Sequence, residues 1–130
     1  MALRWYSIVV DSHDPHALAR WWAETLAWPV VFEAEDEVVI APPGSEQLEG
    51  TVPREQLPQG WVFVPVPEDK TVKNRLHIDL APAPDDDHQG QVDTLLVRGA
   101  TLADVGQADA PWVVLADPEG NEFCVLTPRE

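Results

Sequence analysis

The stretch PWVVLADPEGNEFCVL at residues 111–126 decides the fold of this chain. Its two runs of β-branched and apolar residues, WVVLAD at 112–117 and EFCVL at 122–126, are typical of strands. Between them lies Asp117-Pro118-Glu119-Gly120-Asn121, which has the composition of a turn, and its glycine can adopt a positive φ. The sequence therefore predicts two neighbouring strands joined by a turn at this end of the chain.

The residues before this pair of strands predict a complete module. RLHIDL at 75–80 is typical of a strand, and a helix is expected around 89–98 because Gly99 is a suitable C-cap. TLADV at 101–105 predicts one more strand. The second half of the chain, residues 74–127, is thus expected to follow the order βαβββ.

The first half of the chain predicts the same order. LRWYSIVVD at 3–11 favours a strand, and Asp14 with Pro15 marks a helix start as N-cap and first helical residue. Pro29 ends that helix, and three strands follow, in VVFEAE, in EVVIAP and in WVFVPVP from Trp61 to Pro67. Residues 42–60, rich in Pro, Gly and Glu, are expected to form a long exposed loop. We predict one α+β domain over 1–130, with modules at 3–67 and 74–127.

Acidic residues dominate the composition. The 23 Asp and Glu against 8 Lys and Arg give a formal net charge of −15 at pH 7. Such a surface repels nucleic-acid phosphates and anionic membranes, so neither is an expected partner. No apolar run approaches the roughly 20 residues that span a bilayer, and the start has no signal-peptide pattern, so the expected location is cytoplasmic. A single cysteine, Cys124, excludes a disulfide framework and a cysteine-rich zinc cluster.

Three segments carry a family resemblance: residues 111–126, KNRLHIDL at 73–80, and the first helix DPHALARWWAETLAW at 14–28. They resemble the glyoxalase-like branch of the vicinal oxygen chelate superfamily, which includes bleomycin-resistance proteins and dioxygenases. The residues that match the superfamily's first-helix signature are Trp21, Trp22, Leu26 and Trp28, with Ala27 where the family usually has Gly. The likeness is weakest between Pro42 and Gly60. It implies two βαβββ modules that form a curved mixed-sheet cup, and a homodimer.

The resemblance also implies a divalent-metal site with four ligands, one from the first and one from the last strand of each half. His77 and Glu122 match two of these positions, while Ser7 and Trp61 stand at the other two. Imidazole and carboxylate suit Zn, Ni, Fe or Mn, but catalytic sites usually need about three protein ligands. The expected metal set is therefore incomplete, with His77 and Glu122 also the candidate catalytic pair.

Strand alternation selects further residues for a ligand cup. On each strand one face is expected to pack under a helix and the other to line the cup. The candidates for the cup wall and its polar points are Trp5, Ser7, Trp61, Phe63, Arg75, His77, Asp79, Glu122 and Cys124. A structural interpretation stands beside this one: the polar trio on 75–80 would pair internally, and the aromatic residues would fill a core or a dimer seam.

Two functions from different classes follow. The first is an enzyme, a metal-assisted lyase, isomerase or ring-cleaving dioxygenase, in which His77 and Glu122 bind the metal or move protons. The second is a metal-free protein that sequesters a small organic, partly aromatic ligand, as the bleomycin-resistance resemblance implies. The two missing metal ligands favour the second.

Overall fold

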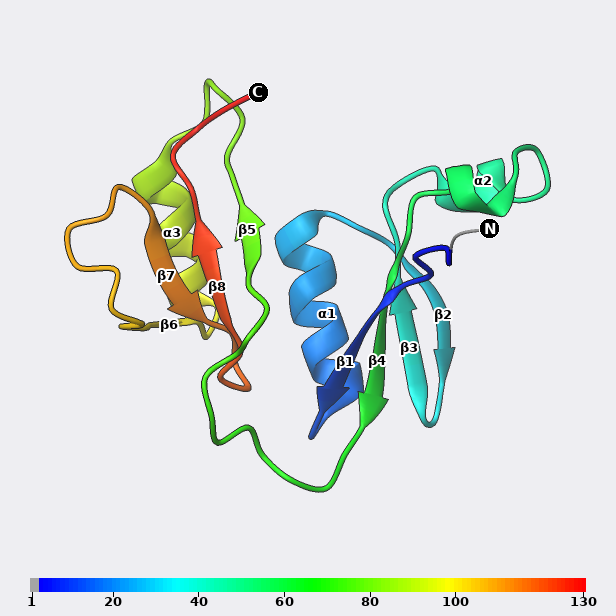
Figure 1. Cartoon of the computed structure of the whole chain (residues 1–130), viewed down its shortest axis with the longest axis horizontal. Helices are drawn as coiled ribbons and strands as arrows, with labels where there is room; N and C mark the ends of the chain where they lie inside the picture. Colours follow the sequence, from blue (N-terminus) through cyan, green and yellow to red (C-terminus); the bar gives the residue numbers. More distant parts are fainter. Residues whose placement is uncertain (1–2) are drawn as a thin grey trace. The chain divides into compact units, whose positions relative to one another are not determined.

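A computed structural model describes residues 3–130, and the chain divides into two compact units with the boundary between Asp69 and Lys70 (Figure 1). Apart from two short helical turns in the first unit, each unit has the strand and helix order βαβββ. The α+β class and the two βαβββ modules are therefore confirmed. The strands of each unit form their own four-stranded sheet.

The first unit has the sheet order β1-β4-β3-β2, with β1 parallel to β4 and the other neighbours antiparallel. Its elements are β1 (Ile8–Ser12), α1 (Pro15–Leu26), β2 (Val30–Ala34), β3 (Glu37–Ile40), α2 (Ser45–Leu48), the 3₁₀ turn η1 (Arg54–Gln56) and β4 (Trp61–Pro65). The expected loop at 42–60 thus contains two short helical turns, α2 and η1.

The ends of α1 follow local chemistry. Asp14 is the N-cap, and its Oδ1 accepts a hydrogen bond from the backbone N–H of Ala17 at 3.2 Å. Pro15 occupies the first helical turn, where a missing N–H costs nothing. At the other end Ala27 adopts the left-handed conformation with φ 55°, and the N–H of Trp28 closes the turn on the carbonyl of Ala23 at 2.9 Å. This cap turns the chain out of the helix before Pro29, so the predicted boundaries are confirmed.

One face of the first sheet is buried against α1. Val38, Ile40 and Phe63 are fully buried there, and Trp61 is nearly so. The strand register aligns Trp61 with Ile40 and Phe63 with Val38, which places these side chains on the same face. The indole of Trp22 on α1 lies 5.0 Å from that of Trp61 between ring centroids. This face, called here the helix face, holds the core of the first unit.

The opposite face of the same sheet, called here the open face, carries the alternate residues of each strand. Val9 is 58% exposed on β1, and its register partner Val62 lies on β4. Val39 of β3 is in turn aligned with Val62. The open face therefore carries apolar side chains that are in contact with solvent, which is a property of a surface that can receive a ligand.

The second unit has the sheet order β5-β8-β7-β6, with β5 parallel to β8. Its elements are β5 (Ile78–Leu80), α3 (His88–Val97), β6 (Thr101–Leu102), β7 (Val113–Ala116) and β8 (Glu122–Val125). Phe123 and Leu115 are aligned on neighbouring strands and buried. No helix among residues 3–130 is long and apolar enough to cross a membrane.

The turn between β7 and β8 is built around Asp117, which is buried. Its Oδ1 accepts hydrogen bonds from the backbone N–H groups of Glu119 at 2.9 Å and Asn121 at 3.0 Å. Gly120 has a φ of 91°, a conformation that a residue with a side chain rarely adopts. The turn predicted from its composition is confirmed.

Candidate functional site

The strand expected at 75–80 begins later than predicted. β5 covers only Ile78–Leu80, so Arg75 and His77 precede it and both are exposed. The reason lies in Asn74, whose Nδ2 donates to the backbone carbonyl of Glu122 at 3.3 Å and whose N–H donates to the Glu122 side chain. These contacts bend the chain before the ladder starts. The prediction that Arg75, His77 and Asp79 share one strand face was wrong, because only Asp79 lies on the strand.

Glu122 stands at the start of β8, as predicted, and its carboxylate is held by two donors. The Lys70 ammonium lies 2.9 Å from Oε2, and the backbone N–H of Asn74 lies 3.0 Å from the same atom. Burial of the carboxyl would raise its pKa, but the hydrogen bonds from Lys70 and Asn74 outweigh that effect and hold the pKa of Glu122 below its usual value. Glu122 is therefore a charged, firmly anchored group.

His77 is held by the same segment. Nε2 of His77 lies 2.9 Å from the Lys73 ammonium, which also donates to the carbonyl of Asn74 at 3.2 Å. Nε2 of His77 also lies 3.3 Å from the carbonyl of Asn74, so it accepts from Lys73 in one tautomer and donates to Asn74 in the other, and the atom is engaged in both. Lys73 thus contacts His77, whereas Lys70 and Asn74 contact Glu122. Each of the two candidate residues is held by a different lysine.

These contacts do not suit a divalent metal. A metal needs an imidazole nitrogen and carboxylate oxygens, and here Lys70 holds Oε2 of Glu122 while Nε2 of His77 contacts Lys73 and the carbonyl of Asn74. In the part of the chain that the structure describes, no group of three His, Cys, Asp or Glu side chains could hold a metal ion. Trp61 has no ligand atom to offer, since its indole nitrogen only donates. The residues present do not fit the metal site implied by the resemblance.

Trp61 and Phe63 lie on the helix face of the first sheet, not in an open cup. Trp61 contacts Trp22 and Trp28 at ring-centroid distances of 5.0 and 6.0 Å and Phe63 at 6.4 Å. The prediction that Trp61 and Phe63 share one face of β4 is confirmed. The prediction that this face lines the cup was wrong, because it packs against α1. The aromatic residues on α1 require partners, and the large rings of β4 bury more apolar surface there than the valines between them would.

The first strand also differs from expectation at its start. β1 begins at Ile8, so Trp5, Tyr6 and Ser7 precede the ladder. Trp5 is 66% exposed, and its Nε1 donates to the carbonyl of Ser7 at 3.3 Å. Tyr6 is 63% exposed and lines a pocket together with Ser7.

Asp79 and Cys124 are register partners on β5 and β8. Cys124 is buried, and burial, then the charge and the hydrogen bond of Asp79, raise the pKa of its thiol. A thiol that stays protonated is a poor nucleophile, so Cys124 acts as a small packed side chain.

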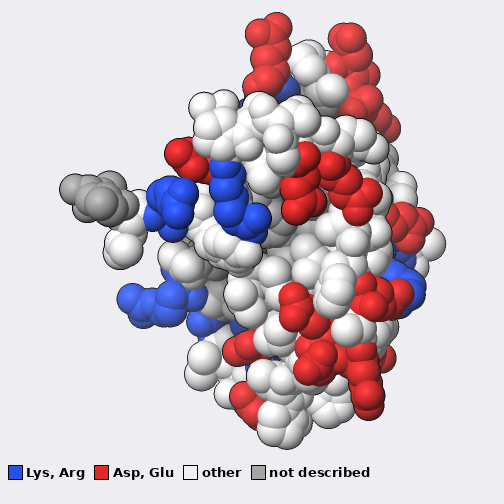
Figure 2. All heavy atoms as spheres, turned by 90° about the vertical axis from the view of Figure 1, so that its right-hand side faces the viewer, with Lys and Arg blue, Asp and Glu red and all other residues white. Residues whose placement is uncertain are grey.

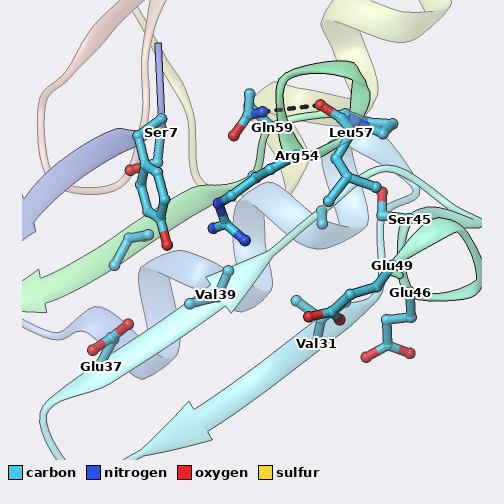
Figure 3. Close-up of a pocket in the computed structure, with 15 residues that line it drawn as sticks. Ser7, Val31, Glu37, Val39, Ser45, Glu46, Glu49, Arg54, Leu57 and Gln59 are labelled. Atoms are coloured by element: carbon cyan, nitrogen blue, oxygen red, sulfur yellow. Dashed lines mark hydrogen bonds between the residues drawn. The ribbon is translucent and has the colours of Figure 1, made fainter. Parts of the chain in front are cut away.

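A pocket of about 260 Å³ opens on the open face of the first unit (Figure 3). This volume is just below the range of about 300–1,000 Å³ for ligand pockets. Its floor is formed by strand residues, and its wall by the segment that contains α2 and η1. The lining residues are Tyr6, Ser7, Val31, Glu37, Val39, Ala41, Ser45, Glu46, Glu49, Arg54, Leu57, Pro58, Gln59, Gly60 and Val62.

Arg54 is the basic residue of this lining. Its guanidinium lies 4.3 Å from the centroid of the Tyr6 ring, a cation–π contact, and in Figure 3 its side chain extends over the strand that bears Val39. Next to it, Arg4 pairs with Glu55 at 3.2 Å, and Nε2 of Gln59 donates to the carbonyl of Leu57 at 2.9 Å. These contacts fix the wall of the pocket to the segment before β1.

Three carboxylates share this lining with the guanidinium of Arg54. Glu37 belongs to β3, Glu46 to α2 and Glu49 to the turn that follows α2. With Arg54 the lining carries a formal charge of −2, from three carboxylates and one guanidinium. Figure 2 shows that Asp and Glu are spread widely over one face of the molecule and that Lys and Arg are fewer there.

This pocket was not predicted from the sequence, because residues 42–60 were expected to form an exposed loop. That segment supplies Glu46, Glu49, Arg54 and Gln59 to the lining. The available signal was Arg54, a basic side chain in a stretch otherwise rich in Glu. Tyr6 was not among the candidates for the cup, because alternation along a strand expected at 3–11 puts it on the face opposite to Trp5 and Ser7.

The comparisons with known proteins agree with this fold. The glyoxalase-like domain family matches residues 7–126. No curated protein sequence matches the chain. Among solved structures, a glyoxalase/bleomycin resistance protein/dioxygenase family enzyme from Burkholderia phytofirmans PsJN is 11% identical, with 98% of this chain and 100% of that chain covered and a TM-score of 0.70.

Two fosfomycin resistance proteins are also similar. FosX from Mesorhizobium loti is 12% identical, with 99% of this chain and 95% of that chain covered and a TM-score of 0.64. A FosX mutant from Listeria monocytogenes, in complex with Mn(II) and dihydroxypropylphosphonic acid, is 8% identical with coverages of 99% and 95% and a TM-score of 0.68. At these identities the likeness concerns the fold alone.

Proposed function

The chain belongs to the glyoxalase-like domain family, and from that premise we propose that it binds a small organic ligand on the open face of its first unit, without a resident metal. The observation that carries this proposal is the pocket of about 260 Å³ between the sheet and the segment 42–60. Ligand pockets combine an apolar floor with a few fixed polar groups, and this one has both.

The lining favours a flat, partly aromatic ligand. Val39 and Val62 offer an apolar floor, and the stacked pair of Tyr6 and Arg54 offers a planar edge. A ring inserted beside that pair would gain offset stacking on the phenol and bury apolar surface on the valines. Because the Arg54 side chain is flexible, it can adjust to the thickness of the ring.

The charge of the lining favours a cationic substituent on that ligand. Glu37, Glu46 and Glu49 outnumber Arg54, and the whole chain carries a net charge of −15. A positive group is therefore attracted both by the local carboxylates and by the general field, and salt weakens that attraction.

The metal-assisted reaction drawn from the family resemblance is not part of this proposal. The FosX complex with Mn(II) belongs to that protein, and here Glu122 and His77 contact Lys70 and Lys73 instead of offering a free ligand pair. Sequestration without chemistry needs only the pocket. The homodimer stays a prediction; β1 and β5 are each an edge strand of their sheet.

The experiment is calorimetric titration with three probes of equal shape and different charge: naphthylmethylamine, naphthylmethanol and naphthoate. We expect the amine to bind roughly tenfold or more tightly than naphthoate, a difference of about 1.4 kcal/mol. The triple change of Glu37, Glu46 and Glu49 to Gln should remove the preference, and Tyr6→Ala should weaken all three probes.

The matched control is Glu68→Gln, which neutralises an exposed carboxylate of the same unit that does not line the pocket. Its affinities should equal those of the unchanged chain. The proposal is wrong if none of the probes binds, or if Tyr6→Ala leaves every affinity unaltered.

A further inference from the structure

Two lysines contact His77 and Glu122, the two residues that the family resemblance implies as metal ligands. The Lys70 ammonium lies 2.9 Å from Oε2 of Glu122, and the Lys73 ammonium lies 2.9 Å from Nε2 of His77. Both lysines come from the short segment that opens the second unit. The positive charge at this place is thus supplied by the chain itself.

The contact between Lys70 and Glu122 is shielded from solvent. The side chains of Lys70 and Glu122 are 20% and 13% exposed, respectively. Both side chains are at least 36% exposed in the ion pairs Arg4–Glu55, His13–Asp69, His16–Glu33 and Arg20–Glu33. Shielding matters because a charge pair with little access to water is screened less by salt. Oε2 of Glu122 accepts a second hydrogen bond, from the N–H of Asn74 at 3.0 Å.

We propose that Lys70 is the resident cation of Glu122 and takes the place of a divalent metal there. An ammonium offers three donors and one positive charge, enough to neutralise one carboxylate without any further ligand. A divalent metal would have to displace Lys70 from Oε2 and would then face the ammonium of Lys73 beside His77. Like charges at such short range repel strongly.

This arrangement gives Glu122 a structural role. Lys70 is the first residue of the second unit, and Asn74 donates both from its N–H to Oε2 and from Nδ2 to the carbonyl of Glu122. Glu122 therefore fastens residues 70–74 to the start of β8. This inference concerns the second unit and does not depend on the ligand proposed for the first.

The test is a double-mutant cycle on the full chain with Lys70→Met and Glu122→Gln, both close in shape to the native residue. We expect each single change to lower the equilibrium constant for folding roughly tenfold or more, and the double change to cost little more than either alone. Lys70→Arg keeps the charge and should recover most of the loss. Lys73→Met, a matched change at an exposed lysine of the same segment, should cost about twofold or less.

Equilibrium dialysis against Mn²⁺ supplies a second readout. The unchanged chain and Glu122→Gln should bind the same amount of Mn²⁺, because Glu122 is not a ligand. Two results would overturn the inference: one Mn²⁺ bound per chain and lost in Glu122→Gln, or effects of Lys70→Met and Glu122→Gln that simply add.

Discussion

The position of Trp61 gives the sharpest prediction about this fold. Sequence alternation placed its indole in an open cup, whereas the structure packs it under α1 with 7% of its surface exposed. Its ring contacts Trp22, Trp28 and Phe63. Trp61→Ala therefore removes the centre of an aromatic cluster instead of a ligand contact.

The cost can be estimated from these contacts. Truncation of a buried large aromatic residue to Ala costs about 3–5 kcal/mol. Each aromatic pair adds about 0.5–1.5 kcal/mol beyond area burial, and these pairs are part of the same loss, so the estimate stays near the upper end, at about 4–5 kcal/mol. Since domains are stable by about 5–15 kcal/mol, the variant should be close to unfolding.

The assay is urea denaturation followed by far-ultraviolet circular dichroism, which does not depend on tryptophan emission. Trp61→Phe keeps an aromatic ring and should cost less than the truncation, so that a measurable variant remains if Trp61→Ala fails to fold. Trp5→Ala is the matched control, because its indole is 66% exposed, and it should cost about 0.5 kcal/mol or less. An equal loss in the free energy of unfolding for Trp61→Ala and Trp5→Ala would refute the reasoning, because it would mean that the Trp61 indole faces solvent.

Two further predictions concern α1. Ala27 holds the left-handed C-cap with φ 55°, so Ala27→Gly should raise the free energy of unfolding by about 0.5–1 kcal/mol in urea titrations, whereas Ala23→Gly inside the helix should lower it; a loss in both variants would contradict the assignment of the cap. Nδ1 of His16 lies 2.7 Å from Oε2 of Glu33, and this hydrogen bond raises the pKa of His16. The folded pKa then exceeds the unfolded value of about 6.5, so this stabilisation is complete below that pH and is lost as pH rises through the folded pKa. His16→Gln should remove that part of the pH dependence of unfolding, and an unchanged pH profile would contradict it.

Local chemistry made the order of elements predictable. Asp14 and Pro15 fix a helix start through atoms one turn away, and Gly120 permits its turn whatever surrounds it. The same holds for the period-two pattern of β4, which separates Trp61 and Phe63 from Val62 correctly. Signals of this kind act over a few residues, so they can be read from the sequence.

The candidate site was less predictable, because its features depend on contacts between distant residues. Asn74 and Glu122, 48 positions apart, end the expected strand early and leave His77 outside it. Arg54 and Tyr6, which are also 48 positions apart, form a cation–π contact, and no pattern in either segment predicts it.

By itself the sequence determined the βαβββ repeat, the N-cap of the first helix, the turn at 117–121 and the family to which the chain belongs. The tertiary structure alone decided which face of each strand is buried, which cation meets Glu122 and where a pocket opens. Periodicity shows which residues of a strand share a face, but it does not show which of the two faces is buried. The buried face is the one that can remove more apolar surface from water by packing against its neighbours.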